Sequence, residues 1–552
     1  MTFTIHNTGR RMFLNRPAAA IFAFAMALSA CGIEPEHRPA EEEGVGAVER
    51  EVSPAPLFYH IFVRSFYDSN GDRQGDLRGI TQKLDYLESL GVTGILLTPL
   101  YPSQFYHNYF ADDFYGVDAE FGDMAAFAEL VAEIHERNMV IYLDQEIQYV
   151  SGQHDWFRSS FKNPQSEFDN FILYADDANN EPVATLFGKM EFDVWPMQKQ
   201  HIYTVNMLEP DVRDYFADYL SFWLDPNGDG DFSDGVDGFR IDHMMDDLDN
   251  AGALTNLFSE FWRPIFDLLR EKKPDIDIIA EQYDWGYGED FLTAGDADKV
   301  FGFPIWRSIG ALDAGGLSEA IVNTNAVMTA GKGQFVFIEN HDTDRFAHAF
   351  ADQPAILKLG AAANLLIGWT PIVYYGQEIG MTGAKIEGEE ARMLEASGDD
   401  ARDIPVRQAF RWNPAPNAPG HATWYRDPVE AYPIDDSNQP GDGRSVEEQR
   451  ARVDSLLQYY RKLSNLRSTY PALGVGETRV ILQFEDQLLI ERRVTEGPSV
   501  VVAFNFSELA AEITVPTGLT LGERILGGAS STLQSEKMTI AAHSASAWLL
   551  EE

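Results

Sequence analysis

The stretch that decides the fold reads V-D-G-F-R-I-D-H-M-M-D, from Val236 to Asp246. Its apolar positions lie among residues of high strand propensity, which predicts a short buried strand. Arg240 and Asp242 are two apart, so on a strand they face the same side. A buried arginine beside a carboxylate keeps that carboxylate ionised. The pair is therefore either a structural ion pair or the ionised carboxylate that a glycosidase nucleophile requires.

Strand and helix patterns alternate on both sides of this stretch. The other predicted strands are 58–63, 95–99, 140–143, 276–280, 300–303, 335–338 and 372–375. The predicted helices are one capped by Asp76 and ended by Gly91, one capped by Asp123, and 212–224, 257–269 and 355–366. Eight strands separated by helices predict parallel βαβ units in an α/β fold, a closed (β/α)8 TIM barrel.

Two long segments interrupt this alternation. We predict a small subdomain inserted after the third strand, at about 145–206, because a plain loop of that length is rare in a compact domain. Residues 382–445 are polar and rich in Gly and Pro, which indicates loops over the barrel mouth. A helix at 446–466 then completes a barrel domain of residues 57–473. The tail, 474–552, alternates without a strong helix and predicts a C-terminal antiparallel β-sandwich.

Composition restricts the classes of partner. The chain has 552 residues, 45% of them hydrophobic, and a net charge of −45. So acidic a surface repels nucleic acid and anionic lipid, which excludes both as direct partners. A neutral ligand such as a sugar is compatible with it.

The N-terminus has the pattern of an export signal. Arg10, Arg11 and Arg16 precede an apolar run, 18–30, that is too short to span a membrane comfortably. We predict a signal peptide at 1–30 and a flexible acidic tether at 31–56. The adjacent arginines at 10 and 11 also look like a twin-arginine signal, which would export a folded protein.

Cys31, the only cysteine, follows Leu-Ser-Ala and resembles the lipidated cysteine of bacterial lipoproteins. The resemblance implies an exported protein whose contact with a membrane is only through a lipid anchor. Gly32 is not an acidic retention signal, so the outer membrane or the cell surface is the expected location. The alternative is an ordinary secretory signal with an incidental cysteine. A single cysteine also excludes an internal disulfide.

Acidic residues stand at the ends of four predicted strands. Asp144 ends the third, Asp242 the fourth and Glu281 the fifth, and Asp342 closes the segment that follows the seventh. In a barrel of this kind these ends meet at one rim, where active sites lie. Carboxyl groups placed together split their pKa values, so that one stays protonated while another stays ionised. This arrangement predicts general acid–base chemistry.

Several motifs resemble those of the α-amylase family of glycoside hydrolases. They are 58–68, 91–99, 107–113, 238–242, Glu281, 340–342 and 374–378. Their number and their order along the chain indicate membership from about Leu57 into the C-terminal domain. The family fold is a (β/α)8 barrel, and its chemistry is retaining double displacement.

The resemblance implies a role for each matched residue. Asp242 would be the nucleophile, Glu281 the general acid and base, and Asp342 the stabiliser of the distorted sugar, with a nucleophile–acid separation of ~5–5.5 Å. Around them, the implied roles are as follows: Arg240 keeps Asp242 ionised, His107 and His341 bond ring hydroxyls, Tyr109 stacks under the sugar, and Asp144 orients the set.

Three segments depart from the family pattern. Gln148 and Tyr149 stand where its third-strand motif has Asn-His, so Tyr149 either replaces a sugar contact or reshapes that pocket. Met245 and Asp246 replace a Lys-His pair that serves the product-side sugar and a calcium ion, so that calcium is not expected. Residues 201–206 match neither the α-1,6 nor the neopullulanase pattern.

Two loops have the spacing of calcium sites. The first places Asp68, Asn70, Asp72, Gln74 and Asp76 at alternate positions, with Gln74 contributing its backbone carbonyl. It resembles the first-loop calcium site of the family's oligosaccharide-cleaving branches, and the alternative is an ordinary polar turn. A second loop repeats the alternation with Asp225, Asn227, Asp229 and Asp231. We predict structural Ca²⁺ in the first and rank the second below it.

Three functions fit these observations. The first is hydrolysis of α-glucosidic bonds, α-1,4 above all, in starch-derived glucans or maltooligosaccharides. The second is transglycosylation, or action on α-1,6 bonds, sucrose or trehalose, at the same site. The third is a non-catalytic glucan-binding lipoprotein, which would have no need for the three acids.

Overall fold

The computed structural model describes residues 55–196, 198–387, 399–416, 418–426, 438–527, 532–534 and 537–551. The predicted signal peptide and Cys31 lie outside these residues, as does nearly all of the tether. Within the described ranges, no helix is both long enough and apolar enough to cross a membrane.

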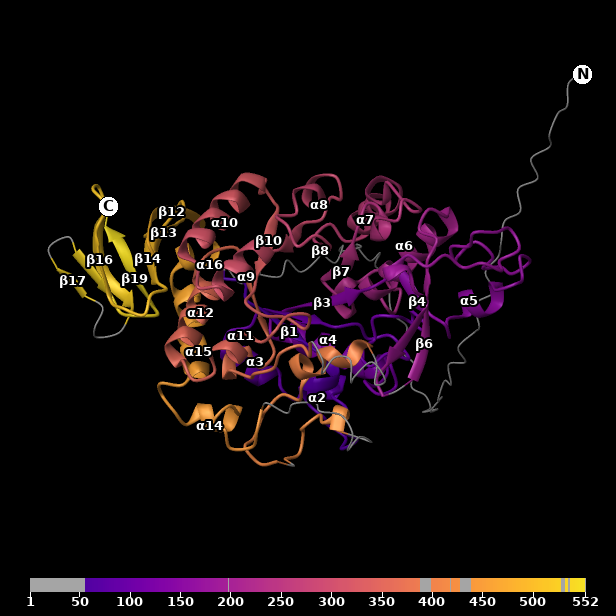
Figure 1. Ribbon diagram of the computed structural model, residues 1–552, viewed down its shortest axis with the longest axis horizontal. Helices are drawn as coiled ribbons and strands as arrows, with labels where there is room; N and C mark the ends of the chain where they lie inside the picture. The colour runs from indigo at the N-terminus through magenta and orange to yellow at the C-terminus, as the bar shows by residue number, and fades with distance from the viewer. Residues whose placement is uncertain are drawn as a thin grey trace, which may run out of the picture. The chain divides into compact units, whose positions relative to one another are not determined.

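Eight parallel strands close into a barrel, as predicted (Figure 1). They are β1 (Phe58–Ile61), β2 (Gly94–Leu97), β3 (Val140–Gln145), β7 (Gly238–Met244), β8 (Asp277–Gln282), β9 (Lys299–Phe301), β10 (Gly333–Val336) and β11 (Thr370–Tyr374). The decisive pairing is between β3 and β7, where Asp144 lies opposite Arg240. Register alone therefore brings a carboxylate of the third strand against the arginine of the fourth.

Aromatic and aliphatic side chains fill the inside of the barrel. The cluster consists of Phe58, Leu96, Tyr142, Ile279, Phe301, Phe303, Phe335, Phe337 and Ile372. Gly238 begins β7 at a point where a Cβ would lie 2.5 Å from the carbonyl oxygen of Asp277 and 2.9 Å from the Tyr142 ring. Only glycine fits there, which explains the first residue of the G-F-R-I-D motif.

Helices alternate with these strands. Their bounds are α1 (Val63–Phe66), α2 (Leu77–Thr81), α3 (Leu84–Leu90), α4 (Met124–Glu136), α5 (Asp155–Ser160), α6 (Pro210–Leu224), α7 (Arg263–Lys272), α8 (Glu289–Thr293), α9 (Phe303–Gly310), α10 (Ala314–Val327), α11 (Phe346–Phe350), α12 (Pro354–Leu366), α14 (Val446–Arg450), α15 (Leu456–Thr469) and α16 (Pro471–Val475). The predicted caps are confirmed: Asp76 accepts a hydrogen bond from Gly79 N, Asp123 accepts one from Ala126 N, and Gly91 is left-handed at φ 84°.

Three predicted helices are divided. The first is split into α2 and α3, and the helix at 257–269 begins as a π-helical turn, Phe258–Trp262, before α7. The segment at 446–466 was predicted as one helix and forms α14 and α15, since Ser445 caps the first and Ser455 caps the second. The strand predicted at 300–303 ends at Phe301, because Phe303 begins α9.

A small antiparallel sheet follows β3. It contains β4 (Tyr149–Ser151), β5 (Glu191–Val194) and β6 (Gln198–Thr204) in the order β4-β6-β5. The backbone N–H of Trp195, just after β5, donates to Asp400 Oδ1 at 2.8 Å. Asp400 belongs to the 3₁₀ segment η6 (Asp399–Arg407), so this hydrogen bond ties the inserted sheet to the long loop that follows β11.

The C-terminal strands form two antiparallel sheets, in agreement with the predicted fold class. The first contains β12 (Glu477–Phe484), β13 (Gln487–Arg493), β14 (Val500–Asn505), β16 (Thr520–Leu526) and β19 (Ser544–Glu551), and the second contains β15 (Ala511–Thr514), β17 (Thr532–Gln534) and β18 (Lys537–Ile540). Trp548 from the first packs with Met538 and Ile540 from the second. Figure 1 shows these strands, in yellow, beside α10, α12 and α16.

Candidate active site

Arg240 of β7 is the centre of an acidic cluster. Its side chain is 2% exposed. Its Nη1 lies 2.7 and 2.9 Å from the two carboxylate oxygens of Asp144 and contacts Asp242, while its Nη2 lies 2.9 Å from Glu281 Oε2. Burial alone would lower the pKa of Arg240, but the charges of these three acids raise it well above its ordinary value. One guanidinium thus links three strand ends.

Glu281, at the end of β8, has the properties of a general acid. Burial, followed by the charges of Asp242 and Asp342, raises the pKa of its carboxyl to about 8, although Arg240 opposes the shift. The backbone N–H of His243 donates to its Oε2 at 3.1 Å. Glu281 therefore carries a proton at neutral pH.

Asp342 has the opposite character. Its Oδ2 lies 2.9 Å from His341 Nε2, and its Oδ1 accepts a hydrogen bond from Arg407 Nη2 at 3.0 Å. Burial would raise the pKa of this carboxyl, but His341 and Arg407 outweigh burial and hold the pKa well below its ordinary value. The cluster thus contains one protonated acid and one firmly ionised acid, which is the division that acid–base chemistry requires.

Tyr109 links Asp144 to His341 through its hydroxyl. It donates to Asp144 Oδ2 at 2.7 Å and lies 2.7 Å from His341 Nε2, and the two rings are stacked with centroids 5.4 Å apart. His107 accepts a hydrogen bond from Tyr109 N at its Nδ1. The predicted sugar contacts are therefore gathered at one place, and their roles toward a sugar stay predictions.

Tyr149 is the first residue of β4, in the inserted sheet. Its side chain is 1% exposed, its hydroxyl is 2.9 Å from Thr185 Oγ1, and it also bonds Asp249. Asp249 Oδ1 in turn lies 3.0 Å from His243 Nε2. The hydroxyl of Tyr149 therefore bonds to protein partners, and whether Tyr149 replaces a sugar contact or reshapes the pocket stays a prediction.

Sequence reasoning missed two residues of this cluster. Arg407 lies in η6, inside the segment predicted only as loops over the mouth, and no spacing singled it out. Glu146 follows β3, is 2% exposed and hydrogen-bonds to Asp242. The sequence shows an acidic residue at this position. Strand alternation ends at Gln145, however, so it does not predict where the side chain of the next residue points.

Comparison with known proteins decides the family. A family model described as "Alpha amylase, catalytic domain" matches residues 60–476. The chain belongs to the alpha-amylase family. It is therefore an enzyme of the retaining glycosidase type, and the family contains both hydrolases and transglycosylases.

Individual relatives in the alpha-amylase family match most of the chain. Alpha-amylase 3 of Dictyoglomus thermophilum is 27% identical over 463 residues, which cover 82% of this chain and 85% of that protein. Trehalose synthase/amylase TreS of Mycolicibacterium smegmatis is 29% identical over 481 residues, 77% of each chain. The crystal structure of an alpha-amylase from H. orenii shares the fold, with a TM-score of 0.72 at 24% identity over 90% of this chain and 100% of that one.

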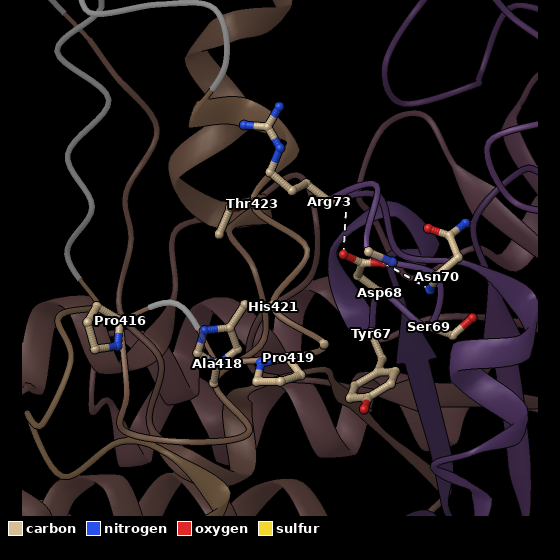
Figure 2. Close-up of a pocket in the computed structure, with 12 residues that line it drawn as sticks. Tyr67, Asp68, Ser69, Asn70, Arg73, Pro416, Ala418, Pro419, His421 and Thr423 are labelled. Atoms are coloured by element: carbon tan, nitrogen blue, oxygen red, sulfur yellow. Dashed lines mark hydrogen bonds between the residues drawn. The ribbon is translucent and has the colours of Figure 1, made fainter.

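The first predicted calcium loop curls around Asp68. Asp68 Oδ1 accepts hydrogen bonds from Asn70 N and Gly71 N, and its Oδ2 accepts one from Arg73 N. Figure 2 shows this loop across a pocket from Pro419, His421 and Thr423. The pocket contains none of the three acids assigned to catalysis.

The second loop repeats this geometry. Asp225 Oδ1 accepts from Gly228 N and Asp229 N, and its Oδ2 accepts from Gly230 N. In both loops the potential metal ligands are hard oxygens. Asp68 Oδ2 and Asp225 Oδ2 each accept only one of these hydrogen bonds and so keep a second lone pair. Across the described ranges, no three His, Cys, Asp or Glu side chains are already gathered as metal ligands. The chemistry of the loops fits Ca²⁺, but their carboxylates would have to converge to bind it.

Proposed function

We propose that this enzyme hydrolyses α-1,4 bonds in starch-derived glucans or maltooligosaccharides by retaining double displacement. The observation that carries the proposal is that Glu281 is protonated while Asp342 is ionised in the same cluster as Asp242. Arg240 contacts Asp242 within this cluster. A protein that only bound glucan would gain nothing from burying these acids at such a cost.

In the first step, the Asp242 carboxylate attacks the anomeric carbon and the glycosidic C–O bond breaks. The departing oxygen takes the proton of Glu281. In the second step, Glu281, now a carboxylate, takes a proton from water, the resulting oxygen bonds the anomeric carbon, and the ester bond to Asp242 breaks. Asp342 stabilises the positive charge that develops on the sugar in both steps.

The choice of linkage rests on two arguments. Residues 201–206, in β6 and just after it, lack the α-1,6 pattern, and one relative is called an alpha-amylase. Transglycosylation is the second candidate, because another relative is called a trehalose synthase/amylase and Tyr149 stands where the family has a histidine that contacts the sugar.

Incubation with a panel of sugars tests both candidates. The panel contains starch, pullulan, cyclodextrin, maltotriose, isomaltose, sucrose and trehalose, with product separation at low and high substrate. We expect cleavage of maltotriose and starch to smaller maltooligosaccharides. Activity on isomaltose alone would overturn the α-1,4 assignment, and new linkages at high substrate would establish transglycosylation.

We also propose that the enzyme is lipid-anchored at the cell envelope through Cys31, after export with residues 1–30 as signal. The support is the Leu-Ser-Ala-Cys order behind an arginine-flanked apolar run. Mass spectrometry of native protein should find acyl groups on an N-terminal Cys31, and Cys31→Ser should leave the precursor largely uncleaved at this site. An unmodified N-terminus elsewhere would refute the anchor.

Structural calcium in the loop Asp68–Asp76 is our third proposal. Asp68, Asn70, Asp72 and Asp76 would supply side-chain oxygens and Gln74 its carbonyl oxygen, with the loop Asp225–Asp231 as a second candidate. The cation would offset the repulsion among the carboxylates and hold the loop, away from the reacting sugar.

A further inference from the structure

A fifth carboxyl group lies directly against the nucleophile segment. Glu146 comes immediately after β3, and its Oε1 accepts hydrogen bonds from Gln148 N at 2.6 Å and Tyr149 N at 3.2 Å. The side chain of Glu146 also hydrogen-bonds to the side chain of Asp242. In addition, Gln148 Nε2 donates to the backbone oxygen of Asp242 at 2.5 Å. The turn after β3 is thus fixed to the nucleophile at two points.

Two carboxyl groups in hydrogen-bond contact must share a proton, because a carboxylate has no donor. Asp242 is the partner that can remain charged, since it contacts Arg240 and its side chain is 18% exposed. Glu146 has a different environment. Burial, followed by the charge of Asp242 and the hydrogen bond to it, raises the pKa of its carboxyl well above the ordinary value.

Two other titratable groups lie against Glu146, and neither is positively charged. Asp249, which follows β7, is acidic and adds to the upward shift. Tyr101, which follows β2, contacts the Glu146 backbone through its hydroxyl, and burial raises the pKa of that phenol well above its ordinary value. The proton therefore belongs to Glu146 and the negative charge to Asp242.

We propose that Glu146 is a positioning residue for the nucleophile: a protonated carboxylic acid whose O–H donates to the Asp242 carboxylate and fixes its orientation. The proposal rests on the nucleophile role given to Asp242 above. It assigns Glu146 no contact with the sugar.

The hydrogen bond should matter most when the glycosyl-enzyme breaks down. Asp242 is a neutral ester in that intermediate and regains its negative charge as the ester C–O bond breaks. A donor that is already in place stabilises this departing carboxylate. Formation of the intermediate removes the negative charge of Asp242, which the hydrogen bond stabilises. The hydrogen bond should therefore accelerate breakdown of the intermediate but not its formation.

Two substitutions distinguish the effect of the hydrogen-bond donor from the effect of side-chain volume. In Glu146→Gln, the amide NH₂ can donate to Asp242 while the amide oxygen accepts from Gln148 N and Tyr149 N. Glu146→Met fills a similar volume without a donor. We expect Glu146→Gln to keep kcat within about threefold of wild type, and Glu146→Met to lose about tenfold or more in kcat, with KM unchanged or lower.

The opposite results would overturn the proposal. If Glu146→Gln loses as much kcat as Glu146→Met, the residue acts as an ionised carboxylate. If a folded Glu146→Met keeps wild-type kcat, the hydrogen bond does not serve the nucleophile. Thermal unfolding of both variants shows whether each is folded.

A spectroscopic measurement keeps the test independent of substrate and of the folding of Glu146→Met. The infrared difference spectrum between wild type and Glu146→Gln at neutral pH should contain the carbonyl band of a protonated carboxylic acid. Glu133→Gln is the matched control, because Glu133 is a part-exposed partner of Arg137 and should contribute only carboxylate bands. Carboxylate bands for Glu146 as well would overturn the proposal, whatever sugar the enzyme cleaves.

Discussion

Buried arginines appear in two regions of this enzyme with opposite surroundings. At the barrel mouth, Arg240 is 2% exposed and faces three carboxyl groups, which raise its pKa well above the ordinary value. At the junction between the last barrel helices and the C-terminal sheets, Arg467 and Arg492 are 1% and 0% exposed. Burial lowers the pKa of each of these two to about 9, and for Arg492 the charge of Arg467 contributes.

The partners at the junction are neutral oxygens. Arg467 donates to four backbone carbonyls, those of Pro56, Leu365, Leu473 and Gly474, at 2.6–3.2 Å. Arg492 donates to Ala472 O, Leu473 O and Thr478 Oγ1.

The difference shows that buried arginines have two separate roles, one in the chemistry of the site and one in the stability of the fold. A buried arginine among carboxylates sets their protonation, whereas a buried arginine among carbonyls holds chain segments together. Changes at the mouth should therefore alter turnover, and changes at the junction should alter stability.

The largest effect is expected from the acids at the mouth. Asp242→Asn and Glu281→Gln should each lower kcat by at least about a thousandfold, because each removes a group that reacts. The melting temperature should stay close to that of wild type, since the replacements keep volume and polarity. Starch cleavage at near-normal rate by a folded Asp242→Asn protein would remove the proposed mechanism.

At the junction, Arg467→Met should lower the free energy of unfolding by on the order of 3 kcal/mol, because four carbonyls lose their donor. Its kcat, measured well below the melting temperature, should be unchanged. Arg479→Met is the control: that side chain is 71% exposed, and the change should stay within about 0.5 kcal/mol. A large loss of kcat with normal stability in Arg467→Met would contradict the division.

The pH dependence of kcat/KM should follow the protonation of Glu281. Its pKa of about 8 lies above its ordinary value of 4.5, so the proton is present at neutral pH and is lost as the pH rises past about 8. The rate should therefore fall on the alkaline side. The folded protein also keeps this proton where the unfolded chain releases it, so the stability contributed by Glu281 is lost as the pH rises from about 4.5 to about 8.

A glycosyl fluoride is the control for this profile, because fluoride leaves without a proton donor. With that substrate, the alkaline fall in glycosyl-enzyme formation should disappear. An alkaline fall of equal size with both substrates would assign the limb to another group.

The smallest effect is expected from calcium. Exhaustive chelation should lower the melting temperature by a few degrees, and added Ca²⁺ should restore it, because the ion binds only the folded loop. Asp72→Ala should remove most of this response, and Asp229→Ala reports on the second loop. An unchanged melting temperature, with no metal found by elemental analysis, would leave both stretches as ordinary turns.

The barrel and the acids of β3, β7 and β8 could be predicted because their signals are local, whereas Asp342 lies six positions beyond the end of β10. Strand patterns, Asp caps and Gly91 each specify one element, and the parallel barrel then fixes which strand ends meet. Helices α9 and α10 escaped prediction, because Pro304 and the pair Gly315–Gly316 resemble loop sequence. In the folded chain Pro304 lies in the first turn of α9, and Asp313 caps α10 through Gly316 N.

The contacts of Glu146 and Arg407 could not be predicted, because each arises from a turn or loop that folds back over the mouth. Glu146 reaches Asp242 only because two backbone N–H groups hold its carboxyl. Arg407 reaches Asp342 from 65 positions away through a 3₁₀ segment. No periodicity in the sequence predicts either of these two contacts.

The central claim is that Asp242 forms a covalent bond to the sugar. Glu281→Gln incubated with an α-glucosyl fluoride tests it most directly, because fluoride needs no acid to leave and the base that would activate water is missing. Intact-protein and peptide mass spectrometry should then find one glucosyl group on the peptide that contains Asp242, attached to that residue. A glucosyl group on a different residue, or turnover of the fluoride with no adduct and inversion at the anomeric carbon, would contradict the account.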